Sequence, residues 1–289
     1  MKKIIALVLS ALVIMSCVFA FAACGNKTGN ETTDASTDAA SDASTEATEA
    51  TEAPELVEDL AAITDAGKLV VGITEYAPMD FKAEDGSWTG FDAEYATLVA
   101  EKLGVEVEFI EIDWDNKVFE LNDKKVDCIW NGMTITDALK ESMDITDPYV
   151  KNAQVVVMKA DAAADYAEDK LASEYTIAVE AGSAADFLAQ DSEYENITAL
   201  SVQSDALLEV ESGKADVAII DKTMAEAMTG EGTSYADLTV AAVLNDEVYG
   251  VGCRKGSDLC TKINEITAEL SEDGTLKTLA EKYGLALAD

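Results

Sequence analysis

The chain of 289 residues carries a formal net charge of −37, from 57 acidic and 20 basic side chains, and it contains no histidine. This charge argues against nucleic acid as a partner, because phosphate binding needs clustered lysine and arginine. The lack of histidine removes Ser-His and Cys-His nucleophile pairs and most catalytic zinc sites. Arg254 is the single arginine.

The first residues combine a short positive segment, "MKK", with an apolar run over residues 4–23 that ends in "FAACG". At ~20 residues the run is long enough to span a bilayer, but small residues before a cysteine are typical of a cleaved signal peptide. They resemble the lipobox of bacterial lipoproteins, apart from Phe21 in place of the usual leucine. We predict a lipoprotein signal peptide over residues 1–23 and a lipid on Cys24 that anchors the chain outside the cell membrane. An uncleaved anchor and lipidation at Cys17 are the alternatives.

Residues 24–59 consist mainly of Thr, Ser, Ala, Asp and Glu, with almost no large apolar side chains. Such a segment cannot bury enough surface to offset the entropy that is lost on ordering. Its like charges also repel one another and extend it. We therefore predict a disordered acidic linker between the membrane and the folded part of the chain.

Strands and helices alternate from residue 60 onward. "KLVVGIT" (68–74) predicts a strand, and the spacing of apolar residues predicts a helix over 92–103, with Asp92 as its N-cap and Gly104 as its stop. Further strands are predicted over 105–110, 126–130, 175–180 and 215–221, and further helices over 117–122, 184–190, 204–213 and near the C-terminus. This alternation indicates an α/β fold with mostly parallel sheets.

Three cysteines lie in the predicted folded part: Cys128, Cys253 and Cys260. An odd number outside the cell leaves at least one thiol free. Cys253 and Cys260 are candidates for a disulfide, but their spacing is weak support for one. We favour the alternative that they are small buried hydrophobic side chains.

Two segments of the chain share one plan. "FELNDKKVDCIWNG" (119–132) and "LEVESGKADVAIID" (208–221) each contain a helix, a turn that ends in lysine, and an apolar strand. This repetition indicates two similar α/β lobes rather than one sheet. Ligands of open α/β sheets bind beyond the carboxyl ends of the strands. We therefore expect residues 131–134 and Asp221 to face each other across a cleft.

The chain contains the motifs "KLVVGITEYAPMDF", "DWDNKVFEL", "GMTITDALKESMDITDPY", "VEAGSAADFL" and "EDGTLKTLAEKYGL". On these motifs residues 60–285 resemble solute-binding protein family 3, the polar amino acid-binding proteins of ABC importers. The resemblance implies a two-lobe, periplasmic-binding-protein-like (type II) clamshell, in which each lobe is a mostly parallel sheet flanked by helices. Lobe 1 would comprise residues 60–154 plus 245–289, and lobe 2 would comprise residues 155–244.

The resemblance also implies an activity. A protein of this kind binds a small polar solute, here an amino acid, between its lobes and delivers it to the permease and ATPase complex of an ABC importer. It works as a monomer, without a cofactor or metal, and it is not an enzyme. Two alternatives stay open: a binder of an amine or other amino acid-like ligand that lacks a conventionally held α-carboxylate, and an enzyme on the same fold.

Ligand-binding residues of lobe 1 follow from the same resemblance. Tyr76 and Trp114 would pack against the ligand, since an aromatic face suits an aliphatic or cationic side chain. The alternative for Trp114 is packing in the core. Asn131, Gly132 and Thr134 match positions that contact the amino and carboxylate groups of the ligand.

Lobe 2 supplies the remaining candidates. Gly182 and Ser183 open a helix, and the N–H groups at a helix N-terminus attract a carboxylate. Asp221 matches the acid that pairs with the ammonium group of the ligand, although it is also a candidate N-cap. Glu180 matches a position that contacts the ligand side chain, with a solvated surface acid as the alternative.

One position departs from the family. Leu139 stands where most members carry an arginine that holds the α-carboxylate through two parallel hydrogen bonds. The first explanation is that Lys140 turns in, although ~100° of rotation per helical residue directs it elsewhere. The second is that helix N-termini and hydroxyl groups hold the carboxylate. The third is a ligand with no α-carboxylate in the usual place. By the resemblance, Arg254 is remote from this position.

Overall fold

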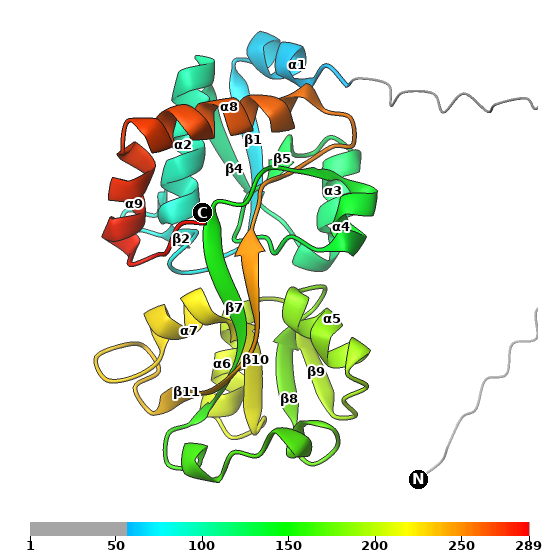
Figure 1. Cartoon of the computed structure of the whole chain (residues 1–289), viewed down its shortest axis with the longest axis vertical. Helices are drawn as coiled ribbons and strands as arrows, with labels where there is room; N and C mark the ends of the chain where they lie inside the picture. Colours follow the sequence, from blue (N-terminus) through cyan, green and yellow to red (C-terminus); the bar gives the residue numbers. More distant parts are fainter. Residues whose placement is uncertain (1–56, 289) are drawn as a thin grey trace, which may run out of the picture. The chain divides into compact units, whose positions relative to one another are not determined.

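Two five-stranded sheets, each covered by helices, make up residues 57–288, which are the residues that the computed structural model describes (Figure 1). We call each sheet with its helices a lobe. The predicted signal peptide, the lipidated Cys24 and residues 24–56 of the predicted linker lie outside the described residues. Between residues 57 and 288 no helix is long and apolar enough to cross a bilayer.

The first lobe is built on a sheet in the order β4-β1-β5-β12-β6. β1 pairs in parallel with β4 and β5, whereas β12 runs antiparallel to β5 and β6. The strands are β1 (Lys68–Ile73), β4 (Glu106–Glu111), β5 (Cys128–Ile129), β6 (Asp144–Ile145) and β12 (Gly252–Cys253). A separate hairpin joins β2 (Phe81–Lys82) to β3 (Trp88–Thr89).

The alternating side chains of β1 determine which helices cover which face of this sheet. Leu69 and Val71 pack in the core beneath α2, while Val70 packs with Leu121 on the opposite face. The first face is covered by α1 (Asp59–Ala66), α2 (Phe91–Leu103), α8 (Asp258–Glu272) and α9 (Thr275–Tyr283), and the second by α3 (Lys117–Asn122) and α4 (Asp137–Ser142).

The second lobe has the strand order β11-β7-β10-β8-β9. β8 pairs in parallel with β9 and β10, and β7 pairs antiparallel with β10 and β11. The strands are β7 (Val150–Lys159), β8 (Ile177–Glu180), β9 (Ile197–Leu200), β10 (Val217–Asp221) and β11 (Leu238–Tyr249). One face packs against α5 (Ala184–Asp191), and the other against α6 (Gln203–Glu211) and α7 (Lys222–Met228).

The predicted α/β fold with two lobes is confirmed, and both sheets are mixed. Each sheet has two parallel and two antiparallel pairings, which is more antiparallel pairing than the sequence predicts. The long strands β7 and β11 run side by side from Val150 opposite Tyr249 to Lys159 opposite Leu238, and Figure 1 shows them leading from one lobe into the other. Parallel neighbours in a sheet must be joined by a crossover, usually a helix. Because β7 and β11 instead carry the chain between the lobes, they can pair antiparallel.

The ends of α2 support one sequence prediction and overturn another. Gly104 ends the helix in the left-handed conformation, with φ 77°, as predicted. Asp92 is not the N-cap, because Gly90 occupies that position with φ 120°. A Cβ atom on Gly90 would lie 2.2 Å from the carbonyl oxygen of Met79, so the helix can start there only at a glycine. Asp92 is instead a buried acid within the first turn of the helix.

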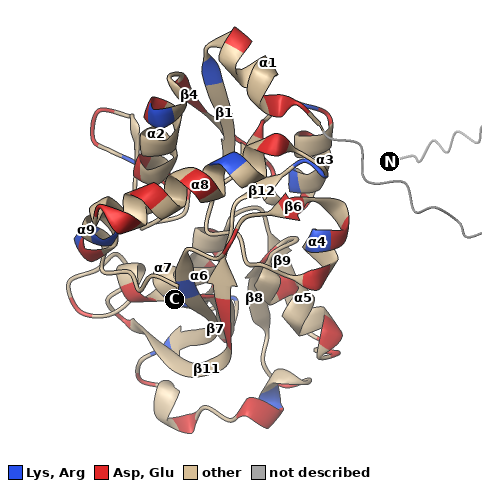
Figure 2. Ribbon diagram, turned by 45° about the horizontal axis from the view of Figure 1, so that its top comes forward, with Lys and Arg blue, Asp and Glu red and all other residues tan. Residues whose placement is uncertain are grey.

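Figure 2 marks the positions of the acidic and basic residues along the ribbon of both lobes, and among them Arg254 has a buried side chain. Its Nη2 atom lies 2.8 Å from Asp59 Oδ1 and 3.3 Å from Asp127 Oδ1, and its Nη1 atom donates to the carbonyl oxygens of Leu121 and Val126. Arg254 therefore joins α1 to the segment before β5.

The cysteines of the described part are all buried, free thiols. Cys128 and Cys253 face each other on neighbouring strands, and Cys260 lies on α8. The structure thus contains no disulfide between Cys253 and Cys260. It agrees with the interpretation that these side chains fill space in the core as small hydrophobic groups.

Candidate ligand-binding site

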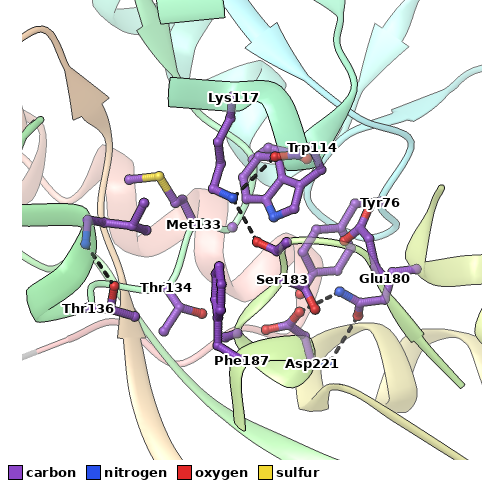
Figure 3. A pocket seen from close by; sticks show the side chains of 16 residues that line it. Tyr76, Trp114, Lys117, Met133, Thr134, Thr136, Glu180, Ser183, Phe187 and Asp221 are labelled. Atoms are coloured by element: carbon purple, nitrogen blue, oxygen red, sulfur yellow. Dashed lines mark hydrogen bonds between the residues drawn. The ribbon is translucent and has the colours of Figure 1, made fainter. Parts of the chain in front are cut away.

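A pocket between the two lobes collects every residue that the sequence analysis proposed for ligand contact (Figure 3). The space left between the side chains is about 30 Å³, which suffices for only a few water molecules. The lining residues are Tyr76, Trp114, Lys117, Asn131, Gly132, Met133, Thr134, Thr136, Leu139, Glu180, Gly182, Ser183, Ala184, Phe187, Gln203 and Asp221.

The carboxyl ends of three strands bring these residues together. β5 leads into Asn131 and Gly132, β8 ends at Glu180, and β10 ends at Asp221. A short 3₁₀ helix, η1 (Trp114–Asn116), follows β4 and carries Trp114. The pocket therefore lies beyond the carboxyl ends of the strands, as ligand sites of open α/β sheets do. The two similar segments, residues 119–132 and 208–221, predicted this position.

Asn131 and Gly132 form the floor of the pocket on the first lobe. Asn131 Oδ1 accepts from the amide nitrogen and the hydroxyl of Thr74, at 3.0 and 2.6 Å, and its Nδ2 atom donates to Asp80 Oδ2 at 2.7 Å. The amide nitrogen of Gly132 donates to Asp92 Oδ2 at 2.6 Å. These groups are engaged inside the lobe, so their main effect here is to hold the floor in place.

Two buried acids lie beneath that floor. Burial raises the pKa of Asp92 to about 7, and burial together with the nearby Asp92 raises the pKa of Asp80 well above its ordinary value. The Oδ1 atoms of both side chains have no hydrogen-bond partner among the described residues. Like charges this deeply buried disfavour double ionisation, so the pair retains a proton near neutral pH.

Tyr76 and Trp114 supply the aromatic part of the pocket, and both side chains are buried. The hydroxyl of Tyr76 bonds to the hydroxyl of Thr223, which belongs to the second lobe, and to that of Tyr249. Gly132 is required beside this ring, because a Cβ atom there would lie 2.6 Å from Tyr76 Cε1, and its φ is +55°. Close packing of Tyr76 thus joins both lobes at the pocket.

Gly182 and Ser183 open α5, but their amide groups are already engaged. Gly182 N donates to Asp186 Oδ2 at 3.0 Å, and Ser183 N donates to the carbonyl oxygen of Glu180 at 3.2 Å. Ser183 Oγ accepts from Asp186 N, which makes Ser183 the N-cap. Since the Asp186 carboxylate already lies at this helix N-terminus, the site is less favourable for a second carboxylate than the sequence suggests.

Asp221 is the most densely bonded acid of the pocket. Its Oδ1 atom accepts from Asn152, from Gln154 at 3.0 Å and from the hydroxyl of Tyr249 at 2.9 Å, and its Oδ2 atom accepts from Gln203 at 2.6 Å. It occupies the N-cap position of α7, but its side chain makes no capping hydrogen bond. The side chain is therefore available to the pocket rather than to the helix.

Glu247, on β11, lies next to Asp221 and was not predicted from the sequence. Its Oε1 atom accepts from the same two amides, Asn152 at 2.7 Å and Gln154 at 2.8 Å, and from Thr134 Oγ1 at 2.8 Å. Burial and the charge of Glu247 raise the pKa of Asp221 well above its ordinary value. No basic side chain of the described residues bonds to either acid, so this corner can accept a cation.

Glu180 is buried in the pocket, which contradicts the interpretation as a solvated surface acid. Burial raises the pKa of its carboxyl group to about 8, against the opposing effect of the Lys117 charge. Its Oε1 atom has no hydrogen-bond partner among the described residues. A donor on a ligand would satisfy this atom.

The basic side chain of the pocket is Lys117, which the sequence analysis missed. It follows Trp114 by three residues, and this spacing in a helical turn places the two side chains side by side. Leu139 also lines the pocket, whereas Lys140 extends to Asp137 at the surface and does not. The cation in the pocket therefore comes from α3 and not from the segment where an arginine was expected.

Comparison of the sequence with known families gives a match over residues 69–286 to the bacterial extracellular solute-binding proteins, family 3. The L-cystine-binding protein TcyJ of Escherichia coli (strain K12) is 28% identical over 227 residues, which cover 78% of this chain and 85% of that protein. The arginine-binding extracellular protein ArtP of Bacillus subtilis (strain 168) is 28% identical over 221 residues, which cover 75% of this chain and 86% of that protein.

Solved structures resemble the described residues as well. An ABC uptake transporter substrate-binding protein from Streptococcus pneumoniae with bound histidine superposes with a TM-score of 0.68 at 32% identity, over 78% of this chain and 96% of that one. The ancestral amino acid-binding protein AncCDT-1, a precursor of cyclohexadienyl dehydratase, gives a TM-score of 0.72 at 32% identity, over 78% and 99% of the two chains.

Proposed function

This chain belongs to the bacterial extracellular solute-binding proteins, family 3, and from that premise we propose that it binds an amino acid for an ABC importer. The observation that carries the proposal is Asp221, a buried acid that lines the pocket between the lobes and has Glu247 beside it, with no basic partner for this acid pair in the described chain. Such a pair suits the ammonium group of an amino acid. Relatives that bind cystine, arginine and histidine support the same ligand class.

The other pocket residues have roles that fit this ligand. We propose that Trp114 and Tyr76 pack against its side chain and that Glu180 accepts a hydrogen bond from it. Asn131 and Gly132 keep the floor of the pocket in place, and Thr134 lies between the floor and Glu247. The lobe boundaries predicted from the sequence, at residues 154/155 and 244/245, fall within β7 and β11, and we propose that bending of these two strands opens and closes the pocket.

The protein would act outside the cytoplasmic membrane as a monomer that delivers its ligand to a permease and ATPase complex. We propose binding without chemistry and without a cofactor, as in the binding proteins that it resembles. An enzymatic role is the second candidate because of the likeness to a precursor of cyclohexadienyl dehydratase. Turnover of a bound compound, followed by mass spectrometry, would establish that role instead.

A lipid on Cys24 is proposed as the attachment to the membrane, on the basis of the "FAACG" pattern at the end of the apolar run. We expect a Cys24→Ser variant to be released into the medium or to remain as an unprocessed precursor. Fractionation and intact-mass measurement distinguish these outcomes from the lipidated form. A variant that is processed and retained at the membrane like the wild type would favour the uncleaved anchor.

The ligand class is tested by thermal unfolding of the purified protein with L-arginine, L-histidine, L-cystine and other amino acids. A ligand present at one hundred times its Kd stabilises the folded state by ~2.7 kcal/mol, which corresponds to an increase in Tm of about 5–10 °C for a chain of this size. Glucose and succinate serve as controls that should leave the Tm unchanged. If no amino acid raises the Tm while amines or short peptides do, the amino acid proposal is wrong.

A further inference from the structure

Lys117 is a buried ammonium group without an ionic partner. Its side chain lies on α3 of the first lobe and is 4% exposed. Its Nζ atom donates to two carbonyl oxygens, that of Gly182 at 2.7 Å and that of Trp114 at 3.2 Å, and lies 4.8 Å from the centre of the Trp114 ring. It forms no ion pair with any carboxylate of the described residues, although Glu180 is near enough to affect its pKa.

Such an environment is unfavourable for a charge. An ammonium group has three donors, and only two are engaged here, both with uncharged acceptors. Burial lowers the pKa of Lys117 to about 8, against the opposing effect of the Glu180, Asp115 and Asp186 charges, none of which forms an ion pair with it. An anion that entered the pocket would supply the missing partner, and its attraction would be strong because water is excluded.

The position of Lys117 complements that of Leu139. Both side chains line the same pocket, one from α3 and the other from α4. Leu139 stands where the family resemblance places the arginine that holds the α-carboxylate, and leucine cannot do so. Among the lining residues Lys117 is the basic one. Figure 3 shows Lys117 and Asp221 approaching the pocket from opposite sides, which suits a ligand with both an anionic and a cationic group.

We propose that Lys117 binds the α-carboxylate of the amino acid, in place of the arginine that is absent at position 139. This inference rests on the proposed function and names the group that gives the site its preference for amino acids over amines. Because Lys117 also contacts Gly182 of the second lobe, a carboxylate bound to it would lie where the two lobes meet. Binding of the carboxylate would thereby favour the closed arrangement of the lobes.

The test compares each amino acid with its decarboxylated amine: L-arginine with agmatine and L-histidine with histamine, which lack the one α-carboxylate, and L-cystine with cystamine, which lacks both. Titration calorimetry is expected to show that the wild type binds at least one amino acid at least ~30-fold more tightly than its amine. In Lys117→Met we expect that amino acid to lose most of this advantage while the affinity for the amine stays the same. Lys117→Arg should keep the preference.

Two further variants make the result specific. In Lys117→Leu/Leu139→Arg the cation returns to position 139, and we expect the preference for the amino acid to return with it. Lys125→Met, which removes an exposed cation just beyond α3, should bind like the wild type. The Tm of each variant without ligand shows that it is folded, and Lys117→Met should be at least as stable as the wild type, since it removes an unpaired buried charge.

The possible results separate this inference from the proposed function. If Lys117→Met binds the amino acid as tightly as the wild type does, Lys117 is only a contact between the lobes, although the protein is still an amino acid receptor. Equal binding of an amino acid and its amine by the wild type also overturns the inference, and supports the amine alternative. If no compound of either kind binds, the proposed function and the inference both fail.

Discussion

An Asp221→Asn variant is expected to bind an amino acid about 100-fold more weakly than the wild type. The substitution keeps the shape of the side chain but removes the buried negative charge that we propose as the partner of the ammonium group. Loss of one member of a buried, hydrogen-bonded charge pair costs ~2–5 kcal/mol of binding free energy. Titration calorimetry with the ligand found in the thermal screen measures the change in Kd directly.

Without ligand, the Asp221→Asn variant should be at least as stable as the wild type. Because the pKa of Asp221 is raised in the folded state, mainly by burial, folding disfavours the charged form of this side chain. Asparagine is neutral at every pH, so the ligand-free variant should unfold at the same Tm as the wild type or higher. Glu226→Gln is the matched control, since it removes an exposed acid of α7 whose Oε1 atom lies 3.5 Å from Lys222 Nζ. A large loss of Tm in Asp221→Asn would indicate a structural role instead.

Binding to the wild type should also depend on pH. Asp221 holds a proton in the ligand-free protein below its raised pKa and must release it to pair with an ammonium group. The affinity for an amino acid should therefore rise with pH, by up to about tenfold per unit, while Asp221 is still protonated without ligand and both Lys117 and the α-amino group keep their charge. Calorimetry in buffers of different ionisation enthalpy should detect proton release in the wild type and none in Asp221→Asn.

Arg254→Met is expected to cause the largest loss of stability. Arg254 is the partner of the buried Asp59 and of Asp127, and methionine leaves these carboxylates without a counter-charge. Breaking a buried ion pair in this way costs ~3–5 kcal/mol of unfolding free energy. Urea unfolding at neutral pH measures the loss. Amino acid affinity below the Tm should be unchanged, because Arg254 does not line the pocket.

The neighbouring cation provides a control for Arg254→Met. Lys255 pairs with Asp144 at the surface, where an ion pair contributes ~0–1 kcal/mol, so Lys255→Met should be close to wild type in unfolding free energy. Adding Asp59→Asn to Arg254→Met should recover part of the lost stability, because it removes one uncompensated charge. Equal destabilisation at positions 254 and 255 would show that burial of the pair is not the cause.

Local sequence patterns determined much of this protein. Apolar alternation in "KLVVGIT" predicts β1, and the periodicity before Gly104 predicts α2, because hydrophobic burial and helix termination act over a few residues. Polar residues directly after apolar strands predicted where the pocket lies. The fold places Asn131, Glu180 and Asp221 together there, since parallel strands end at the same edge of a sheet.

Only the tertiary structure decided what these residues do to one another. Asp92 lies at a helix start in the sequence, yet it is a buried acid that holds the amide of Gly132, forty residues away. Lys117 looks like a surface lysine of a short helix, yet it reaches the carbonyl oxygen of Gly182 across the pocket. Partners this distant in sequence are brought together by packing of the two lobes, and neither propensity nor periodicity contains that information. The charge of the pocket, with Glu180 and Asp221 from one lobe and Lys117 from the other, is therefore a property of the folded chain.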